Sequence, residues 1–306
     1  MNQAAATAPQ AQPPDAPARI ADLRAGQRLE GAFACARKDR LTARNGSVYL
    51  ALELRDRTGS LQARVFREVD RVGLRFDAGD AVAVAGRVER FRGELVAELD
   101  EVRRLEPGSF DPADFLPAAY RSVAELEGFL EHLISEVHHD RMREVVTALL
   151  ISGPQAAEFR RAPCTPAGHH AYLGGLLEHT VAVGTLVLEA WQLHQRLNSD
   201  LLMAAALIHD IGKVREFTYG AEFGISAEGR LLGHLAIGAE LIGPAAQGLA
   251  DDERLALLNC VLSHHGPEGT PGRGGRGRFG SPEALALYRI NALDASVKGA
   301  LETGAF

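Results

Sequence analysis

The run from Leu201 to Val214, LLMAAALIHDIGKV, constrains this chain more than any other stretch. An apolar segment of helical character ends in the adjacent pair His209 and Asp210, and Lys213 follows one turn later. Burying a carboxylate beside an imidazole is costly unless a cation or another partner compensates the charge. A nitrogen and an oxygen ligand side by side also suit a divalent metal ion. The segment therefore predicts a buried helix that ends in a metal site.

Further potential ligands occur at wide intervals, each on a different predicted helix or helix end. They are His179, His234, His264, His265 and Asp294. Helices packed in a bundle can each point one side chain into a shared interior, which is how metal sites in helical bundles are made. A lone histidine on an apolar face is more often a core residue. Several on successive helical segments favour a shared site.

The whole chain has the composition of a soluble globular protein, with 306 residues, 46% hydrophobic residues and a net charge of −7. No apolar run reaches the roughly 18 residues of a membrane span, so no membrane partner is expected. Residues 1–18, rich in Ala, Pro and Gln, predict a disordered tail and not a signal peptide. The three cysteines are far apart, which favours a reducing, cytoplasmic location.

Residues 19–105 predict five or six short strands and hence a small closed barrel. The segments Val48–Leu54 and Leu61–Phe66 alternate between apolar and polar residues, and a D-x-T-G turn separates them. The order resembles the OB-fold of nucleic-acid-binding proteins. Basic and aromatic side chains there are candidate contacts for single-stranded nucleic acid: Arg37, Lys38, Arg44, Tyr49, Arg64 and Phe66. In the alternative interpretation the aromatic residues are core and the basic ones are solvated.

A proline-rich linker is expected at residues 106–121, followed by an all-α domain over residues 122–306. A small hairpin between Glu216 and Arg230 and a glycine- and arginine-rich loop at 266–280 interrupt the helices. Polar residues at the expected helix starts predict N-caps at Ser122, Asp140, Asn198–Asp200, Asp251–Asp252 and Ser281. The fold class is thus a β-barrel followed by a helical domain.

The order H…HD…D, filled by His179, His209-Asp210 and Asp294, is the signature of the HD superfamily of metal-dependent phosphohydrolases. The segments HHAYLGGLLEHT (169–180), ALIHDIGKV (206–214), LSHHG (262–266) and FGSPEALAL (279–287) resemble those of the YhaM-type 3′-to-5′ exoribonucleases. That family also carries an OB-fold ahead of its HD domain. The resemblance implies a metal-dependent exonuclease that hydrolyses single-stranded RNA to nucleoside monophosphates, with DNA as a further candidate substrate. The direction of digestion rests on the resemblance alone.

Roles follow for the individual residues. One ion is expected at His179, His209, Asp210 and Asp294, and a second at His234, His264 and His265, with Asp210 bridging the two. Two such ions could clamp a scissile phosphate. Mn²⁺ is the first choice, with Fe²⁺, Co²⁺ or Mg²⁺ as alternatives, because imidazole and carboxylate ligands suit such ions. The lack of thiolate ligands argues against a structural zinc. Cys164 and Cys260 stand apart from it in the sequence and are expected to play no part.

Three further residues are predicted to act on the phosphate or beside it. Lys213 would neutralise charge in the transition state, unless it is only a solvated charge at a helix C-terminus. His170 and Arg161 precede the first ligand helix and are candidate phosphate contacts, although His169 or His170 could simply cap that helix. The predicted catalytic group is therefore Lys213, Asp210 and His170.

Two other functions stay open at this point. One is an HD phosphohydrolase for a cyclic nucleotide or nucleoside triphosphate, with the barrel serving assembly. The other is a nucleic-acid-binding protein whose helical domain is structural or regulatory, against which the complete set of ligands argues. The sequence leaves the oligomeric state open.

Overall fold

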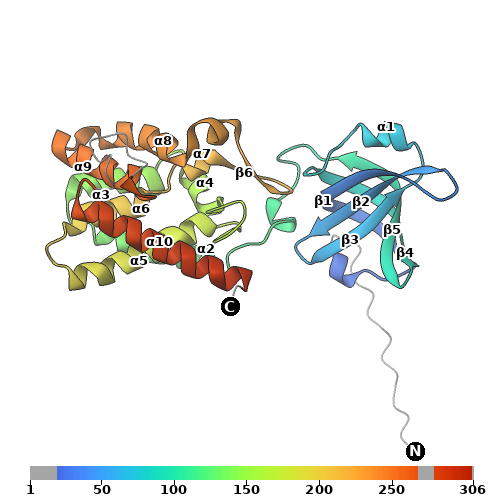
Figure 1. The fold of residues 1–306 in the computed structure, drawn as a ribbon, viewed down its shortest axis with the longest axis horizontal. Helices are drawn as coiled ribbons and strands as arrows, with labels where there is room; N and C mark the ends of the chain where they lie inside the picture. Colours follow the sequence, from blue (N-terminus) through green and yellow to red (C-terminus); the bar gives the residue numbers. More distant parts are fainter. Residues whose placement is uncertain (1–18, 268–278, 305–306) are drawn as a thin grey trace, which may run out of the picture. The chain divides into compact units, whose positions relative to one another are not determined.

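The computed structural model describes residues 19–267 and 279–304. The predicted tail at 1–18 and most of the predicted glycine- and arginine-rich loop lie outside these residues. The chain divides into two compact units, Met1–Phe115 and Leu116–Phe306. Figure 1 shows the first unit as a β-barrel and the second as a bundle of helices, which confirms the predicted fold class.

The first unit is a closed barrel with the strand order β1-β2-β3-β5-β4, in which β3 and β5 run parallel. Its strands are β1 (Arg28–Thr42), β2 (Val48–Asp56), β3 (Gly59–Val65), β4 (Ala81–Phe91) and β5 (Glu94–Arg104). The short helix α1 (Val69–Gly73) joins β3 to β4, and the 3-10 turns η1 (Ile20–Asp22) and η2 (Pro112–Asp114) flank the barrel.

Alternation along the strands fills the barrel interior. Leu50, Leu52 and Leu54 of β2 are buried, while the residues between them are more exposed. The predicted turn after β2 is held by Asp56, whose Oδ1 accepts from the Thr58 N–H at 2.7 Å. The other oxygen of Asp56 accepts from the Ile20 N–H at 2.8 Å, so the turn also fixes the start of the described chain.

The second unit consists almost entirely of helices (Figure 1). They are α2 (Val123–Ser135), α3 (Asp140–Leu150), α4 (Ala156–Arg161), α5 (Gly175–Leu193), α6 (Ser199–Ile208), α7 (Lys213–Glu216), α8 (Ala227–Ala245), α9 (Asp251–Leu262) and α10 (Pro282–Thr303), with the 3-10 turn η3 (Ala246–Gly248) after α8. The expected hairpin is β6 (Phe217–Tyr219) paired with β7 (Phe223–Ile225).

Helix α6 forms the centre of the helical core, because every residue from Leu201 to Ile208 is buried. An all-round apolar helix of this kind is stable only when other helices surround it. The predicted caps Ser122, Asn198 and Ser281 are confirmed, since each side chain accepts a hydrogen bond from the first turn of its helix.

Two predicted caps are wrong. His139 caps α3 through Nδ1, and Asp140 is the first helical residue. Helix α9 has Ala250 at its N-cap position, so Asp251 and Asp252 lie inside the first turn, where their charge favours the helix dipole. In the described part of the chain, no helix combines the length and apolar character needed to cross a membrane.

Candidate metal centre

The HD pair lies where the central helix ends. His209 is the C-cap residue of α6 and is fully buried, and Asp210 is 2% exposed. The turn that follows passes close to α8: a Cβ at Gly212 would lie 2.1 Å from the His234 carbonyl oxygen. Only glycine permits this approach, which brings the HD pair next to His234.

Backbone carbonyls fix two of the histidine rings. His209 Nδ1 lies 2.8 Å from the Ala206 carbonyl oxygen, and His264 Nδ1 lies 2.6 Å from that of Val261. A carbonyl oxygen only accepts, so each Nδ1 carries the hydrogen. The lone pair of each Nε2 is therefore free to bind a cation.

Carboxylates fix two more rings in the same way. His179 Nδ1 lies 2.7 Å from Asp294 Oδ2, and His234 Nδ1 lies 3.0 Å from Glu216 Oε2. Glu216 also accepts from the backbone N–H of His234 at 3.2 Å, because α8 is broken at Gly233 (φ 68°) and restarts at His234. A carboxylate behind a ligand histidine is the usual second partner in metal sites. Sequence reasoning missed Glu216, although an acid so close to the HD motif was a signal for it.

The Nε2 atoms converge on Asp210 in two sets. On Asp210 Oδ2, His209 and His179 approach to 3.3 and 3.5 Å. On Asp210 Oδ1, His264 and His234 approach to 3.3 and 3.6 Å. His265 joins the second set, with its Nε2 2.9 Å from that of His234. The arrangement brings together the predicted histidine ligands around Asp210, whereas the predicted ligand Asp294 lies on the opposite, Nδ1 side of the His179 ring.

The donor atoms of both sets suit divalent cations. Asp210 Oδ1 and His264 Nε2 are buried and have no hydrogen-bond partner among the described residues. Such atoms are costly unless a partner binds them. The Nε2 atoms of His179 and His209, only 3.2 Å apart, face each other with lone pairs if both rings are neutral. A cation would relieve each of these conflicts, so the residues present fit the ion that the HD pattern implies.

Burial keeps two of the ligand rings neutral, which metal binding requires. It lowers the pKa of His179 to about 4 and that of His264 to about 3. Burial alone would raise the pKa of Asp210, but the charge of Lys213 and the neighbouring histidines hold it well below its usual value. Asp210 is therefore ionised at neutral pH.

Lys213 is itself a buried residue at 5% exposure. Its Nζ lies 2.6 Å from Asp210 Oδ2 and 3.4 Å from the Sγ atom of Cys164. Burial would lower the pKa of Lys213, but the Asp210 charge raises it above its ordinary value. A solvated helix-end charge is thus excluded for Lys213, while its contact with phosphate stays a prediction. The expectation that Cys164 stands apart from the centre is wrong, because tertiary structure brings the thiol against it.

His170 has no ring nitrogen free for a phosphate. Its Nε2 lies 3.0 Å from Asp294 Oδ2, and its Nδ1 lies 2.8 Å from the hydroxyl of Tyr172, which donates to Glu178. The residue is only 2% exposed. We therefore assign His170 to positioning Asp294. Asp294 Oδ2 thus contacts both His170 Nε2 and His179 Nδ1. The role of Asp294 as a metal ligand therefore stays a prediction.

The barrel residues predicted to bind nucleic acid fall into two groups. Tyr49 and Phe66 lie side by side on the outer surface, with ring centres 5.4 Å apart. Arg64 covers the half-exposed ring of Phe91 at 4.1 Å, and sequence reasoning missed Phe91, although the Arg-Phe-Arg run at the hairpin tip was a signal. Lys38 instead bonds to the backbone carbonyls of Gly73 and Phe76 and to Asp77, so it has a structural role.

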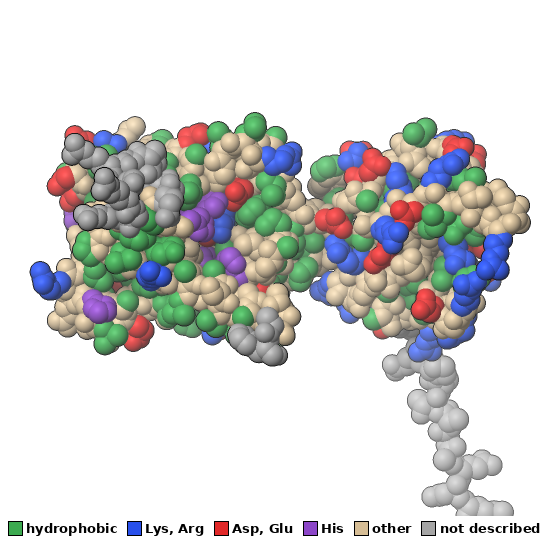
Figure 2. Space-filling view, viewed as in Figure 1, with side chains coloured by type: hydrophobic (Ala, Val, Ile, Leu, Met, Phe, Trp, Pro, Cys, Tyr) green, Lys and Arg blue, Asp and Glu red, His purple; other side chains and the backbone are tan. Residues whose placement is uncertain are grey.

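The remaining candidates lie on the surface of their units. Arg37 is largely exposed and pairs with Asp39 at 2.6 Å, Arg44 follows β1, and Arg161 is the last residue of α4. Figure 2 shows histidine side chains at the surface of the helical unit, with acidic and basic side chains beside them. Among the ligands, His265 is exposed and His234 is partly buried, so the metal centre is partly open to solvent.

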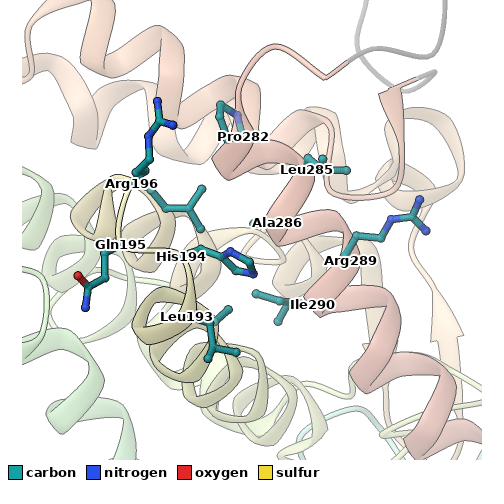
Figure 3. Close-up of a pocket in the computed structure, with 11 residues that line it drawn as sticks. Leu193, His194, Gln195, Arg196, Pro282, Leu285, Ala286, Arg289 and Ile290 are labelled. Carbon is teal, nitrogen blue, oxygen red and sulfur yellow. The ribbon is translucent and has the colours of Figure 1, made fainter.

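A separate cavity of about 730 Å³ lies between the end of α5 and the start of α10. Figure 3 shows Leu193, His194 and Ile290 around it, while the guanidinium groups of Arg196 and Arg289 point outward. It holds none of the predicted ligands and is not part of the metal centre.

Comparison with known proteins agrees with both units. The HD domain family matches residues 176–296, and the OB-fold nucleic acid binding domain family matches residues 35–105. The 3′-5′ exoribonuclease YhaM of Listeria welshimeri is 27% identical over 91% of this chain and 88% of its own length. The YhaM protein of Oceanobacillus iheyensis is 29% identical over 89% of this chain and 85% of its own length. That of Bacillus subtilis is 30% identical over 83% of this chain and 81% of its own length.

The fold and the centre thus define a metal-dependent HD-domain hydrolase with an OB-fold nucleic-acid-binding domain ahead of it. Both domains occur in the order that the resemblance implied. The chain belongs to the YhaM family of 3′-5′ exoribonucleases.

Proposed function

We propose that this protein is a divalent-metal-dependent exonuclease that digests single-stranded RNA from its 3′ end and releases nucleoside monophosphates. The observation that carries the proposal is the pair of ligand sets that meet at the two oxygens of Asp210. A single set of metal ligands would suit many kinds of hydrolase. Two sets that share a carboxylate suit cleavage of a phosphodiester.

His179, His209, Asp210 and Asp294 would hold one ion, and Asp210, His234, His264 and His265 the other. The bound ions would supply Lewis acidity and neutralise phosphate charge. Mn²⁺ is our first choice, because imidazole and carboxylate ligands suit it, with Fe²⁺, Co²⁺ and Mg²⁺ to be compared.

The side chains around the ions have distinct tasks in this proposal. Lys213, held charged by Asp210, adds positive charge next to the phosphate position. His170 holds Asp294, and Asp294 in turn holds the ring of His179, so both keep a ligand in one orientation. Arg161 remains a candidate contact for the RNA backbone.

The barrel would hold the strand ahead of cleavage. Tyr49, Phe66 and Phe91 offer ring faces on which bases can stack, and Arg64 lies against one of them. Stacking of this kind tolerates any base sequence and is worth about 1–3 kcal/mol per base. The small-nucleotide alternative leaves this aromatic surface without a purpose, so we do not favour it.

The test is digestion of single-stranded RNA labelled at its 5′ end, with metal-free protein supplied with Mn²⁺. We expect a ladder that shortens stepwise toward the label, absent without metal and absent for Asp210→Ala. Asp252→Ala, which changes an exposed acid in α9, is the matched control and should behave as wild type. Intact RNA in the presence of bound metal, or full activity of Asp210→Ala, would refute the proposal.

The digestion assay also tests the preference for RNA over DNA and the choice of metal ion, and a separate measurement tests the number of bound ions. An identical DNA strand measures the preference for RNA, and separate additions of Fe²⁺, Co²⁺ and Mg²⁺ rank the ions. Native mass spectrometry of the metal-loaded protein gives the number of bound ions and the oligomeric state together. One bound ion at saturation would contradict the two-set arrangement.

A further inference from the structure

We propose that Cys164, His169 and His179 form a second kind of cation site, selective for thiophilic ions such as Zn²⁺ and Cd²⁺. Occupation of this site would exclude the catalytic ion, because His179 belongs to both. The cation site itself stands on the geometry below. Its inhibitory consequence rests on the function proposed above.

Cys164 is held in a fixed position beside the HD pair. The residue is fully buried in the segment between α4 and α5, and its backbone N–H donates to the His170 carbonyl at 3.1 Å. Its Sγ lies 3.7 Å from His169 Nε2 and 3.9 Å from Asp210 Oδ2. The thiol therefore faces the metal centre and not the apolar core.

The spacing of the ligand atoms approaches that of a tetrahedral zinc site. The donor atoms of Cys164, His169 and His179 all lie within 4.8 Å of one another. With ordinary zinc–sulfur and zinc–nitrogen bonds, neighbouring ligand atoms in a tetrahedron lie about 3.3–3.6 Å apart. The thiol and His169 already have nearly this separation. Asp210 Oδ2, 3.5 Å from His179 Nε2, is placed to complete the set.

The chemistry of the donors separates this site from the two sets described above. Those sets contain only nitrogen and oxygen, whereas this one adds a sulfur. Thiolates select zinc, cadmium and copper(I), while Mn²⁺ and Mg²⁺ avoid them. Binding would form a metal–sulfur bond and release the thiol proton to solvent, so the step is balanced without any oxidant or reductant.

Lys213 contacts residues of both this site and the catalytic one. Burial raises the pKa of the Cys164 thiol to about 12, and the Lys213 ammonium, 3.4 Å from the Sγ atom, opposes part of this shift. The ammonium also contacts the carboxylate of Asp210 that both sites share. The positive charge therefore does not discriminate against the thiophilic ion. His169 is only partly buried, which leaves an open side for the ion to enter.

The test is titration of the metal-free, full-length protein with Cd²⁺, followed by the ultraviolet charge-transfer absorption of a cadmium–thiolate bond. We expect a saturable band in the native protein and in Cys260→Ser, which changes a buried thiol that lies 4.0 Å from the Ser281 hydroxyl and belongs to no ligand cluster of the described residues. Cys164→Ser should lose the band, and His169→Gln should keep it but need about tenfold more Cd²⁺. No band in the native protein, or a full band in Cys164→Ser, would overturn the proposal.

His169→Gln keeps the test valid if Cys164→Ser does not fold, because His169 is near the surface. An unchanged Cd²⁺ affinity for His169→Gln would also overturn the proposal. Zn²⁺ inhibition is the second measurement: in the Mn²⁺-supported digestion, Zn²⁺ should compete with Mn²⁺, and His169→Gln should need about tenfold more Zn²⁺. A band without nuclease activity would refute the proposed function alone, and activity without a band would refute the thiophilic site alone.

Discussion

Glu216→Gln provides a sharp test of the second ligand set. The Glu216 carboxylate accepts from two donors of one residue, the Nδ1–H of His234 at 3.0 Å and its backbone N–H at 3.2 Å. Burial would raise the pKa of Glu216, but its bonds with His234 lower it, so the carboxylate is charged. Glutamine has the same shape but only one accepting oxygen.

The substitution therefore leaves one donor of His234 facing an NH₂ group. If that donor is Nδ1, the ring must exchange its hydrogen to Nε2, and Nε2 can then no longer bind a cation. Loss of such a second partner costs about 10–100-fold in metal affinity. At about 1.36 kcal/mol per tenfold, the expected loss is roughly 1.4–2.7 kcal/mol.

The assay is calorimetric titration of the metal-free protein with Mn²⁺. We expect Glu216→Gln to weaken one class of site by the factor above and to leave the class built on His179 and His209 unchanged. Glu240→Gln is the matched control, since Glu240 is an exposed acid on α8 that pairs with Arg215 at 3.2 Å and contacts neither ligand set. Unchanged affinity at both classes in Glu216→Gln would show that the carboxylate does not position His234.

Three further substitutions test other steps. Gly212→Ala should lower the free energy of unfolding by at least about 2 kcal/mol in denaturant titration, because its Cβ would overlap the backbone of α8, whereas Gly243→Ala has open space and should not destabilise. Asn198→Ala should cost about 1 kcal/mol in the same titration through loss of the α6 cap. Phe91→Ala should weaken RNA binding in fluorescence anisotropy by about 1–3 kcal/mol, with Phe129→Ala, an exposed phenylalanine of α2, as the unaffected control. Equal effects within either pair would contradict the reasoning.

Sequence reasoning succeeded where the signal is local. The N-caps at Ser122, Asn198 and Ser281 depend on a side chain and the N–H three residues later, so the motif itself contains the contact. The apolar run of α6 likewise predicted a central buried helix. At Asp140 the same rule failed, because the neighbouring His139 offers its ring nitrogen as the cap.

It failed where the contact depends on tertiary structure. Lys38 was a candidate for nucleic acid, but carbonyl oxygens some 35 residues later bind its ammonium. Cys164 lies 46 residues from Asp210 and still faces it. Glu178, which the sequence places beside His179, accepts a hydrogen bond from the hydroxyl of Tyr172, and that hydroxyl lies against His170. No periodicity in the sequence reports such contacts.

The four fixed histidines combine both kinds of signal. His209 and His264 each stand just past a helix and donate to the carbonyl three residues earlier, which belongs to the last turn of that helix. Their orientation is therefore local, and a substitution elsewhere cannot readily remove it. His179 and His234 have no such carbonyl and depend on distant carboxylates, Asp294 and Glu216.

This difference divides the centre into ligands that the helix ends orient and ligands that other side chains orient. Each ion set contains at least one of each kind: His209 with His179, and His264 with His234. In each set, the ring that a helix end orients would thus keep its geometry when a carboxylate is lost, while the ring that the carboxylate orients would be free to turn. Because a neutral ring can ligate only through the nitrogen without hydrogen, loss of the carboxylate weakens a site by freeing its tautomer, with the ligand residue itself still in place. Substitution of Glu216 should therefore lower the metal affinity of the second set through His234 alone, whereas substitution of Asp294 removes an expected ligand as well as the partner of His179. Substitution of Asp210 should abolish both sites.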